Sequence, residues 1–160
     1  MSIKLRKFEL EDAQKIAELV RDEAVSKWTS NIPFPYSELD AIDWIRRTSS
    51  DSSRHPFAVE LNGELVACVS YWPYESSAIE VGFWVGKDFW GKGVCTIALK
   101  LLLSSNYFPA EKDVFARIMA NNAGSRRVLE KCGFSFLKNG AFFRGNFEAE
   151  ARVYVRRVAT

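Results

Sequence analysis

Alternating apolar and polar residues predict four strands in the first half of the chain, with two helices after the first strand. A short strand is expected near residues 3–8, and apolar residues at helical spacing follow from Ala13 to Val20. A second helix should begin where Ser37 and Asp40 resemble a capping box. Alternation over 57–61 and 65–71, on either side of an Asn-Gly pair, predicts a tight hairpin, and residues 79–85 predict a fourth strand.

The second half of the chain continues with strands and helices in turn. Residues 93–104 are apolar on every side, as expected of a helix packed against a sheet. A strand over 114–119 precedes a helix over 122–132, which Gly133 should end in a left-handed conformation. Strands are then expected near 134–137 and 151–158. The order βααβββαβαββ predicts an α/β protein with a mixed sheet covered by helices.

Composition narrows the class of protein. The chain has 160 residues, which fits one domain spanning 1–160, and its 48% hydrophobic content is typical of a soluble globular protein. A net charge of +2, without a dense basic stretch, gives no support to nucleic-acid binding. No apolar run is long enough for a signal peptide or a membrane span, so a cytoplasmic location is expected.

Cysteine and histidine content argues against a structural metal. The three cysteines, Cys68, Cys95 and Cys132, lie in apolar contexts, and one histidine cannot complete a zinc site with them at any standard spacing. We therefore expect free, mostly buried thiols and no metal site.

The segment 80–96, EVGFWVGKDFWGKGVCT, carries the most informative chemistry. In it a strand leads into a Gly-x-Gly turn, Gly91 to Gly93, that opens an apolar helix. Unpaired backbone N–H groups and the positive end of the helix dipole favour phosphate at such a point. The two glycines alone are more typical of an ordinary strand-to-helix turn, and only a second motif favours the phosphate site. Asn121 to Phe134, NNAGSRRVLEKCGF, supplies a second motif downstream.

Together these motifs resemble the GNAT superfamily of acyl-CoA-dependent N-acyltransferases, in particular the RimJ/RimL type. The resemblance covers nearly the whole chain and implies a single-domain fold with a mostly antiparallel mixed sheet of about six to seven strands, flanked by about four helices. It implies acetyl transfer from acetyl-CoA to a primary amine, in a monomer or homodimer. Two positions depart from the family pattern: Asp88 begins the cofactor motif Q/R-x-x-G-x-G/A, and Leu129 occupies the position of a tyrosine found in many members.

By this resemblance, acetyl-CoA would lie along the strand ending at Gly86 and against the following turn. Asn122 and Ser125 match the family motif N-x-x-S, and Ser125 would protonate or stabilise the departing thiolate. Helix capping is the alternative role for both residues. Charged residues such as Arg127 and Lys131 would contact cofactor phosphates or simply face solvent. The cofactor contacts implied in this way are Phe83, Trp84, Val85, Trp90, Gly91, Lys92, Gly93, Val94, Asn122 and Ser125.

Glu80 is the candidate general base. The resemblance places the thioester beside Gly82 and Phe83, and a carboxylate whose pKa is raised by burial can accept the ammonium proton directly or through one water. The alternative is a structural ion pair or an exposed strand terminus.

The resemblance also suggests that Trp28, Tyr36, Trp72 and Phe142 line the acceptor side of the cleft. Burial in the hydrophobic core is the alternative role for each of these aromatic residues. The acceptor would be a protein N-terminal α-amine or a small-molecule amine. A non-catalytic acyl-CoA-binding or interaction module is the alternative function, and it would need neither Glu80 nor Ser125.

Overall fold

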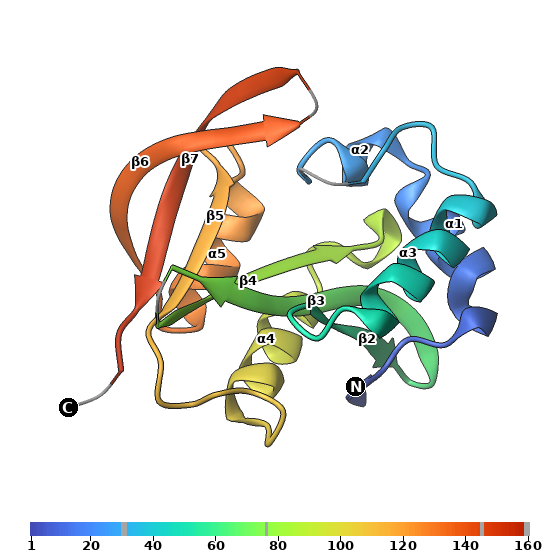
Figure 1. Ribbon diagram of the computed structural model, residues 1–160, viewed down its shortest axis with the longest axis horizontal. Coiled ribbons are helices and arrows are strands. Elements are labelled where there is room, and N and C mark those ends of the chain that lie inside the picture. Colours follow the sequence, from blue (N-terminus) through green and yellow to red (C-terminus); the bar gives the residue numbers. More distant parts are fainter. Residues whose placement is uncertain (30–31, 76, 145, 159–160) are drawn as a thin grey trace.

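The computed structural model describes residues 1–29, 32–75, 77–144 and 146–158. Seven strands form one sheet (Figure 1). The strands are β1 (Ile3–Arg6), β2 (His55–Leu61), β3 (Glu64–Tyr74), β4 (Ala78–Val85), β5 (Val114–Met119), β6 (Ser135–Arg144) and β7 (Phe147–Arg156). The α-helices are α1 (Ala13–Val20), α2 (Glu23–Ser26), α3 (Glu38–Ser50), α4 (Val94–Ser104) and α5 (Ala123–Lys131), with short 3₁₀ turns at Leu10–Asp12 and Lys87–Phe89.

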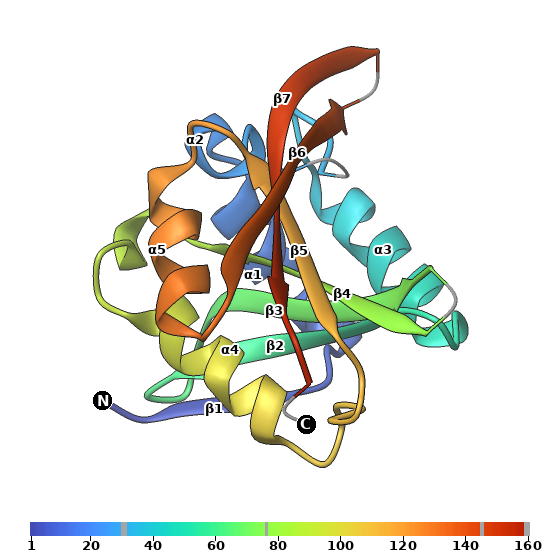
Figure 2. The same cartoon turned by 90° about the vertical axis from the view of Figure 1, so that its left-hand side faces the viewer.

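The sheet opens between its two central strands. Its order is β1-β2-β3-β4-β5-β7-β6, and every neighbouring pair is antiparallel except β4 and β5. The parallel pairing covers only Ile79–Val81 against Val114–Ala116. Beyond this point β4 continues to Val85 beside β3, and β5 continues to Met119 beside β7. The two strands therefore diverge (Figure 2), and after Val81 this edge of β4 has no neighbouring strand among the described residues.

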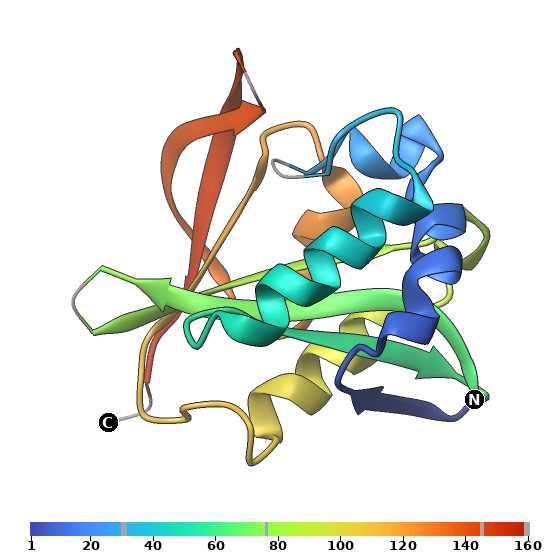
Figure 3. The same ribbon diagram turned by 45° about the vertical axis from the view of Figure 1, so that its right-hand side comes forward.

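Helices cover both faces of the sheet. Helices α1 and α3 lie on one face, where buried Ile16, Val20 and Ile45 form one apolar cluster (Figure 3). Helix α4 lies on the other face, and its Leu99 and Leu102 are fully buried in the larger cluster. Packing of α1 and α3 on one face and of α4 on the other buries apolar area and so holds the sheet in place.

The β6–β7 hairpin curls toward α2 and the segment that follows it (Figure 1). The guanidinium of Arg144 donates hydrogen bonds to the carbonyl oxygens of Ser26 and Thr29. Trp28 packs against a small cluster of Met119, Phe142 and Ala151. The β6–β7 hairpin and the segment after α2, which are far apart in sequence, therefore contact each other near the point where β4 and β5 separate.

The predicted order of strands and major helices is confirmed, with three corrections. The four-residue helix α2 was not predicted, because it is too short to show an apolar period. Strands β6 and β7 extend to a shared tip, well beyond the predicted 134–137 and 151–158, because β6 is largely exposed and does not alternate clearly. Phe8 lies outside β1 and instead contacts the ring of Trp44 edge-on.

Candidate active site

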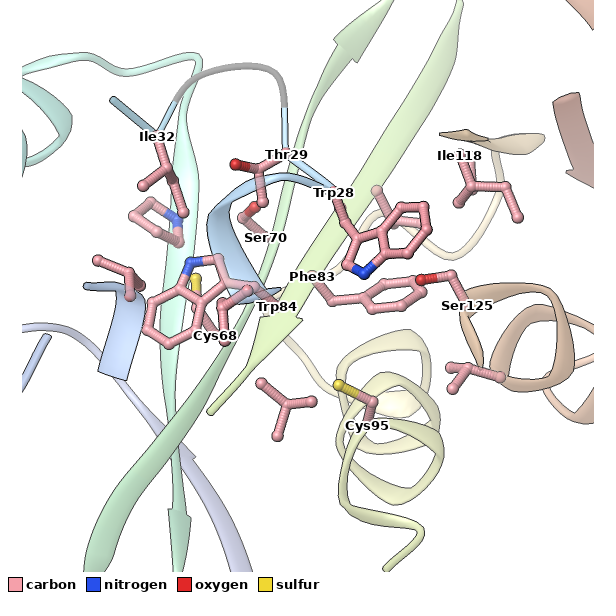
Figure 4. A pocket seen from close by; sticks show the side chains of 18 of the residues that line it. Trp28, Thr29, Ile32, Cys68, Ser70, Phe83, Trp84, Cys95, Ile118 and Ser125 are labelled. Carbon is pink, nitrogen blue, oxygen red and sulfur yellow. The ribbon is translucent and has the colours of Figure 1, made fainter. Parts of the chain in front are cut away.

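A continuous cleft of about 1370 Å³ occupies the opening between β4 and β5. Its walls come from β3, β4 and β5, the starts of α4 and α5, the segment around α2, helix α3 and the curled part of β6. In Figure 4 the side chains of Trp28, Phe83 and Ser125 point toward the same part of this cleft. The divergence of the strands therefore opens a large cleft in this part of the molecule.

The start of α4 forms one end of the cleft. Gly93 precedes the helix with φ +76°, and Gly91 has φ +75°, a conformation that favours glycine. A Cβ at either glycine would meet nothing within 4 Å, so these positions present open backbone to the cleft. The first helical hydrogen bond runs from Ile97 N to Gly93 O, which leaves the preceding N–H groups without helical partners.

A tryptophan fastens this turn to β4. The indole N–H of Trp90 donates to the carbonyl of Val85 over 2.9 Å. The Val85 carbonyl is therefore already engaged, and a ligand beside β4 would find its free backbone groups elsewhere on that edge.

Glu80 lies in the cleft wall, on the part of β4 that still pairs with β5. It is opposite Trp72 on β3 and Phe115 on β5. Burial raises the pKa of the Glu80 carboxyl, and the charges of Arg117 and Arg54 together with the Trp72 indole N–H oppose this shift only in part. Glycine at position 82 makes room for the Trp72 ring, because a Cβ there would lie 2.7 Å from Trp72 Cη2.

Two arginines in the cleft wall were not predicted as site residues. Arg117 extends from β5, and its Nη1 donates to the carbonyl of Ala141 over 3.0 Å. Its Nε is buried and has no partner among the described residues. The guanidinium of Arg54 lies over the Trp72 ring, 4.9 Å from its centroid. A charged residue inside the apolar stretch VFARIM is the sequence signal that could have identified Arg117.

Helix α5 begins at the opposite wall from α3. Asn122 caps this helix, because its side-chain oxygen accepts from Ser125 N over 3.1 Å. Ser125 also lines the cleft and points into it (Figure 4). Capping is therefore present, and it leaves the Ser125 hydroxyl free to meet a ligand.

Of the remaining predicted residues, most line the cleft and a few do not. Lys92 does not line the cleft, and its ammonium lies over the Phe89 ring instead. Arg127 and Lys131 of α5 do line it. Leu129, at the position of the family tyrosine, is fully buried in the core. The other predicted cofactor, catalytic and acceptor residues are brought together in one cleft: Trp28, Tyr36, Trp72, Glu80, Phe83, Trp84, Val85, Trp90, Gly91, Gly93, Val94, Asn122, Ser125 and Phe142.

Fold and site together define an α/β enzyme with a cleft between two diverging parallel strands and a helix start at one end. The profile of the acetyltransferase (GNAT) domain matches residues 2–135, and the chain therefore belongs to the GNAT acetyltransferase family. It is an acetyltransferase, as are the named relatives that it matches.

Among these relatives is YdaF of Bacillus subtilis, which carries the provisional name of a ribosomal N-acetyltransferase. It is 30% identical over 142 residues, covering 82% of this chain and 77% of YdaF. The sequence resemblance to the GNAT superfamily is thus confirmed.

Solved structures share the fold over almost the whole chain. Mycobacterium smegmatis RimJ, in complex with CoA-disulfide, has a TM-score of 0.83 and 18% identity, covering 97% of this chain and 81% of RimJ. Vibrio cholerae spermidine N-acetyltransferase, in complex with CoA and spermine, has a TM-score of 0.80 and 17% identity, covering 98% of this chain and 96% of that enzyme. Within the described part of the present chain, every helix is too short or too polar to span a bilayer.

Proposed function

We propose that residues 1–160 form one N-acetyltransferase domain that moves an acetyl group from acetyl-CoA to a primary amine. The observation that carries this proposal is a single cleft with unpaired helix N–H groups at one end and the half-buried Glu80 carboxylate at the other. The edge of β4 that lacks a neighbouring strand joins the two ends. The acceptor class is a protein N-terminal α-amine or a small-molecule amine.

Acetyl-CoA would bind with its pyrophosphate at Gly91 to Val94. Backbone N–H groups there converge at a helix start, which favours phosphate without a dedicated cation. The cofactor's amide-bearing arm would extend along β4 past Phe83 as if it were an added strand. Structures of fold relatives, M. smegmatis RimJ and V. cholerae spermidine N-acetyltransferase, contain CoA species and support this assignment.

Direct transfer needs two proton removals from the acceptor nitrogen. Glu80 takes the first, directly or through one water, and leaves a neutral amine. The amine nitrogen then bonds to the acetyl carbonyl carbon, the carbon–sulfur bond breaks, and the sulfur departs as a thiolate. Ser125 or a water supplies a proton to that thiolate, and the second proton that leaves the nitrogen reprotonates this donor. Burial suits Glu80 to this role, because a raised pKa makes a carboxylate a stronger base.

Acceptor-dependent thiol release tests the proposal. The full chain would be mixed with acetyl-CoA and a panel of peptides and small amines, and free CoA would be followed with a thiol reagent. We expect release that depends on at least one amine. Binding of acetyl-CoA without amine-dependent release would instead support a non-catalytic acyl-CoA-binding module.

A further inference from the structure

The acceptor end of the cleft presents opposite charges that are not joined in an ion pair among the described residues. Glu80 and Arg117, both in the described part of the chain, do not form an ion pair. The pairing of Glu80 with Phe115 places Arg117, two residues further along β5, on the same face of the sheet. A carboxylate and a guanidinium therefore line one space between the diverging strands.

The Arg117 guanidinium lines the cleft and keeps one buried donor that no described residue satisfies, so an anion reaches that donor only when neighbouring side chains shift. Nη1 is held by the carbonyl of Ala141, whereas Nε is buried without a partner among the described residues. The Nε and Nη2 donors of a guanidinium point in parallel and match the two oxygens of a carboxylate. A buried donor without a partner is costly, so a ligand that supplies an acceptor there gains affinity.

Other charges on this side of the cleft are already engaged or exposed. Asp40 accepts from the backbone and hydroxyl of Ser37, and Asp51 does the same from Ser53. Asp43 and Arg47 of α3 are exposed. Arg54 adds a second positive charge beside Trp72. The half-buried charges at the strand divergence are therefore one carboxylate and one guanidinium, whereas a polycationic acceptor would need several free carboxylates.

From this arrangement we infer that the acceptor is a small zwitterionic amine whose anionic group lies close to the amine, as in a free α-amino acid. Its ammonium would face Glu80, and its carboxylate would bind the free edge of the Arg117 guanidinium. The contact of Arg144 with the carbonyls of Ser26 and Thr29 ties the hairpin over this end of the cleft, which favours a small acceptor over a peptide. This inference rests on the proposed acetyl transfer to an amine and narrows its acceptor.

Matched acceptors test the inference on the unaltered enzyme. Free α-amino acids would be compared with their α-amides, in which a carboxamide replaces the carboxylate, and with aminoalkylphosphonates as the other source of an anion. We expect kcat/KM to be about tenfold to hundredfold higher for the acids than for the amides, the range of a charge-assisted hydrogen bond. Equal kcat/KM for acids and amides, or preference for an N-terminal peptide or a polyamine, would overturn the inference while leaving acetyl transfer intact. Absence of transfer to every amine would overturn the proposed function as well.

Variants of Arg117 provide a second test of the inference. Arg117→Gln should lower the acid-over-amide ratio to near one by raising KM for the acid, with little change in KM for the amide. Arg46→Gln, which removes the same charge from an exposed position on α3, should keep the wild-type ratio. Arg117→Lys keeps the charge but loses the two-pronged geometry, so its ratio should lie in between. An unchanged ratio in folded Arg117→Gln would contradict the inference, and the comparison of acids with amides remains decisive if that variant does not fold.

Discussion

At the scale of single residues, Glu80 is the proposed general base for acetyl transfer. Burial raises its pKa, and the charges of Arg117 and Arg54 oppose this rise in part. Glu80→Gln keeps the shape and removes the base, so kcat should fall by about 10²–10⁴-fold. The dissociation constant of acetyl-CoA should stay unchanged, because the proposed cofactor contacts lie beyond Gly82. Glu111→Gln, at an exposed position outside the cleft, is the matched control, and near-full kcat in Glu80→Gln would refute the assignment.

The same carboxyl should make activity depend on pH. Only the ionised form of Glu80 accepts a proton, and its pKa is raised from 4.5. The acidic limb of a plot of log kcat/KM against pH should therefore lie above pH 4.5 and should disappear or move in Glu80→Gln. A profile whose acidic limb is identical in both proteins would show that another group titrates.

Stability carries an independent signature of the buried carboxyl. A pKa raised in the folded state means that the stability contribution of Glu80 is full below the unfolded-state pKa and is lost as pH rises through the folded-state pKa. Glutamine does not titrate, so Glu80→Gln should gain stability relative to wild type between about pH 4 and neutral pH. Denaturant unfolding of both proteins at about pH 4 and at neutral pH measures this change. A stability difference between them that does not vary with pH would argue against a raised pKa of Glu80.

Sequence reasoning proposed Glu80 as a site residue but not Arg117, although both line the cleft, and the reason is physical. Glu80 lies a few residues before a turn with a recognisable motif, so its position could be inferred from that motif. Arg117 belongs to a strand whose neighbours are apolar, and only the divergence of β4 from β5 turns its side chain toward a cleft. That divergence depends on pairing between distant segments, which local periodicity does not encode.

At the scale of elements, the turn before α4 is the proposed site of the cofactor pyrophosphate. Gly93 has φ +76°, and open space surrounds the position of a Cβ. Gly93→Ala should cost about 1 kcal/mol of stability through the left-handed backbone. It should also weaken acetyl-CoA binding measurably in calorimetry, because the added methyl group stands where phosphate would approach.

The hairpin turn offers a matched control for that change. Gly63 has φ +87°, also with nothing within 4 Å of a Cβ, but it does not line the cleft. Gly63→Ala should show a similar loss of stability and unchanged acetyl-CoA affinity. Equal affinity in both variants would mean that the turn before α4 does not hold the cofactor.

The elements with the strongest local sequence patterns, a turn and a helix cap, were predicted correctly. Asn62 and Gly63 both have positive φ, as a two-residue turn between antiparallel strands requires, and the predicted hairpin is present. Ser37 and Asp40 form the predicted capping box at the start of α3. By contrast, α2 has four residues and no period, and the exposed β6 is held mainly by pairing with β7. Their extent depends on tertiary contacts.

At the scale of the whole molecule, Arg144 joins the β6–β7 hairpin to the segment after α2. Its guanidinium bonds to the carbonyls of Ser26 and Thr29, close to the cluster around Trp28. Arg144→Gln should release this tie and raise KM for the acceptor while leaving acetyl-CoA affinity unchanged. Arg46→Gln controls for charge, and an unchanged acceptor KM would show that the tie does not shape the acceptor end.

The most direct test of direct transfer within the cleft is mass spectrometry of the enzyme, amine and isotopically labelled acetyl-CoA during turnover. The label should appear on the acceptor nitrogen while the intact mass of the protein stays unchanged, because acetyl passes straight from sulfur to amine. Cys68 and Cys95 line the cleft, but burial raises the pKa of both thiols and so disfavours the nucleophilic thiolate, and Cys132 is buried outside the cleft. Label that accumulates on the protein before reaching the amine, or never reaches an amine, would contradict this mechanism.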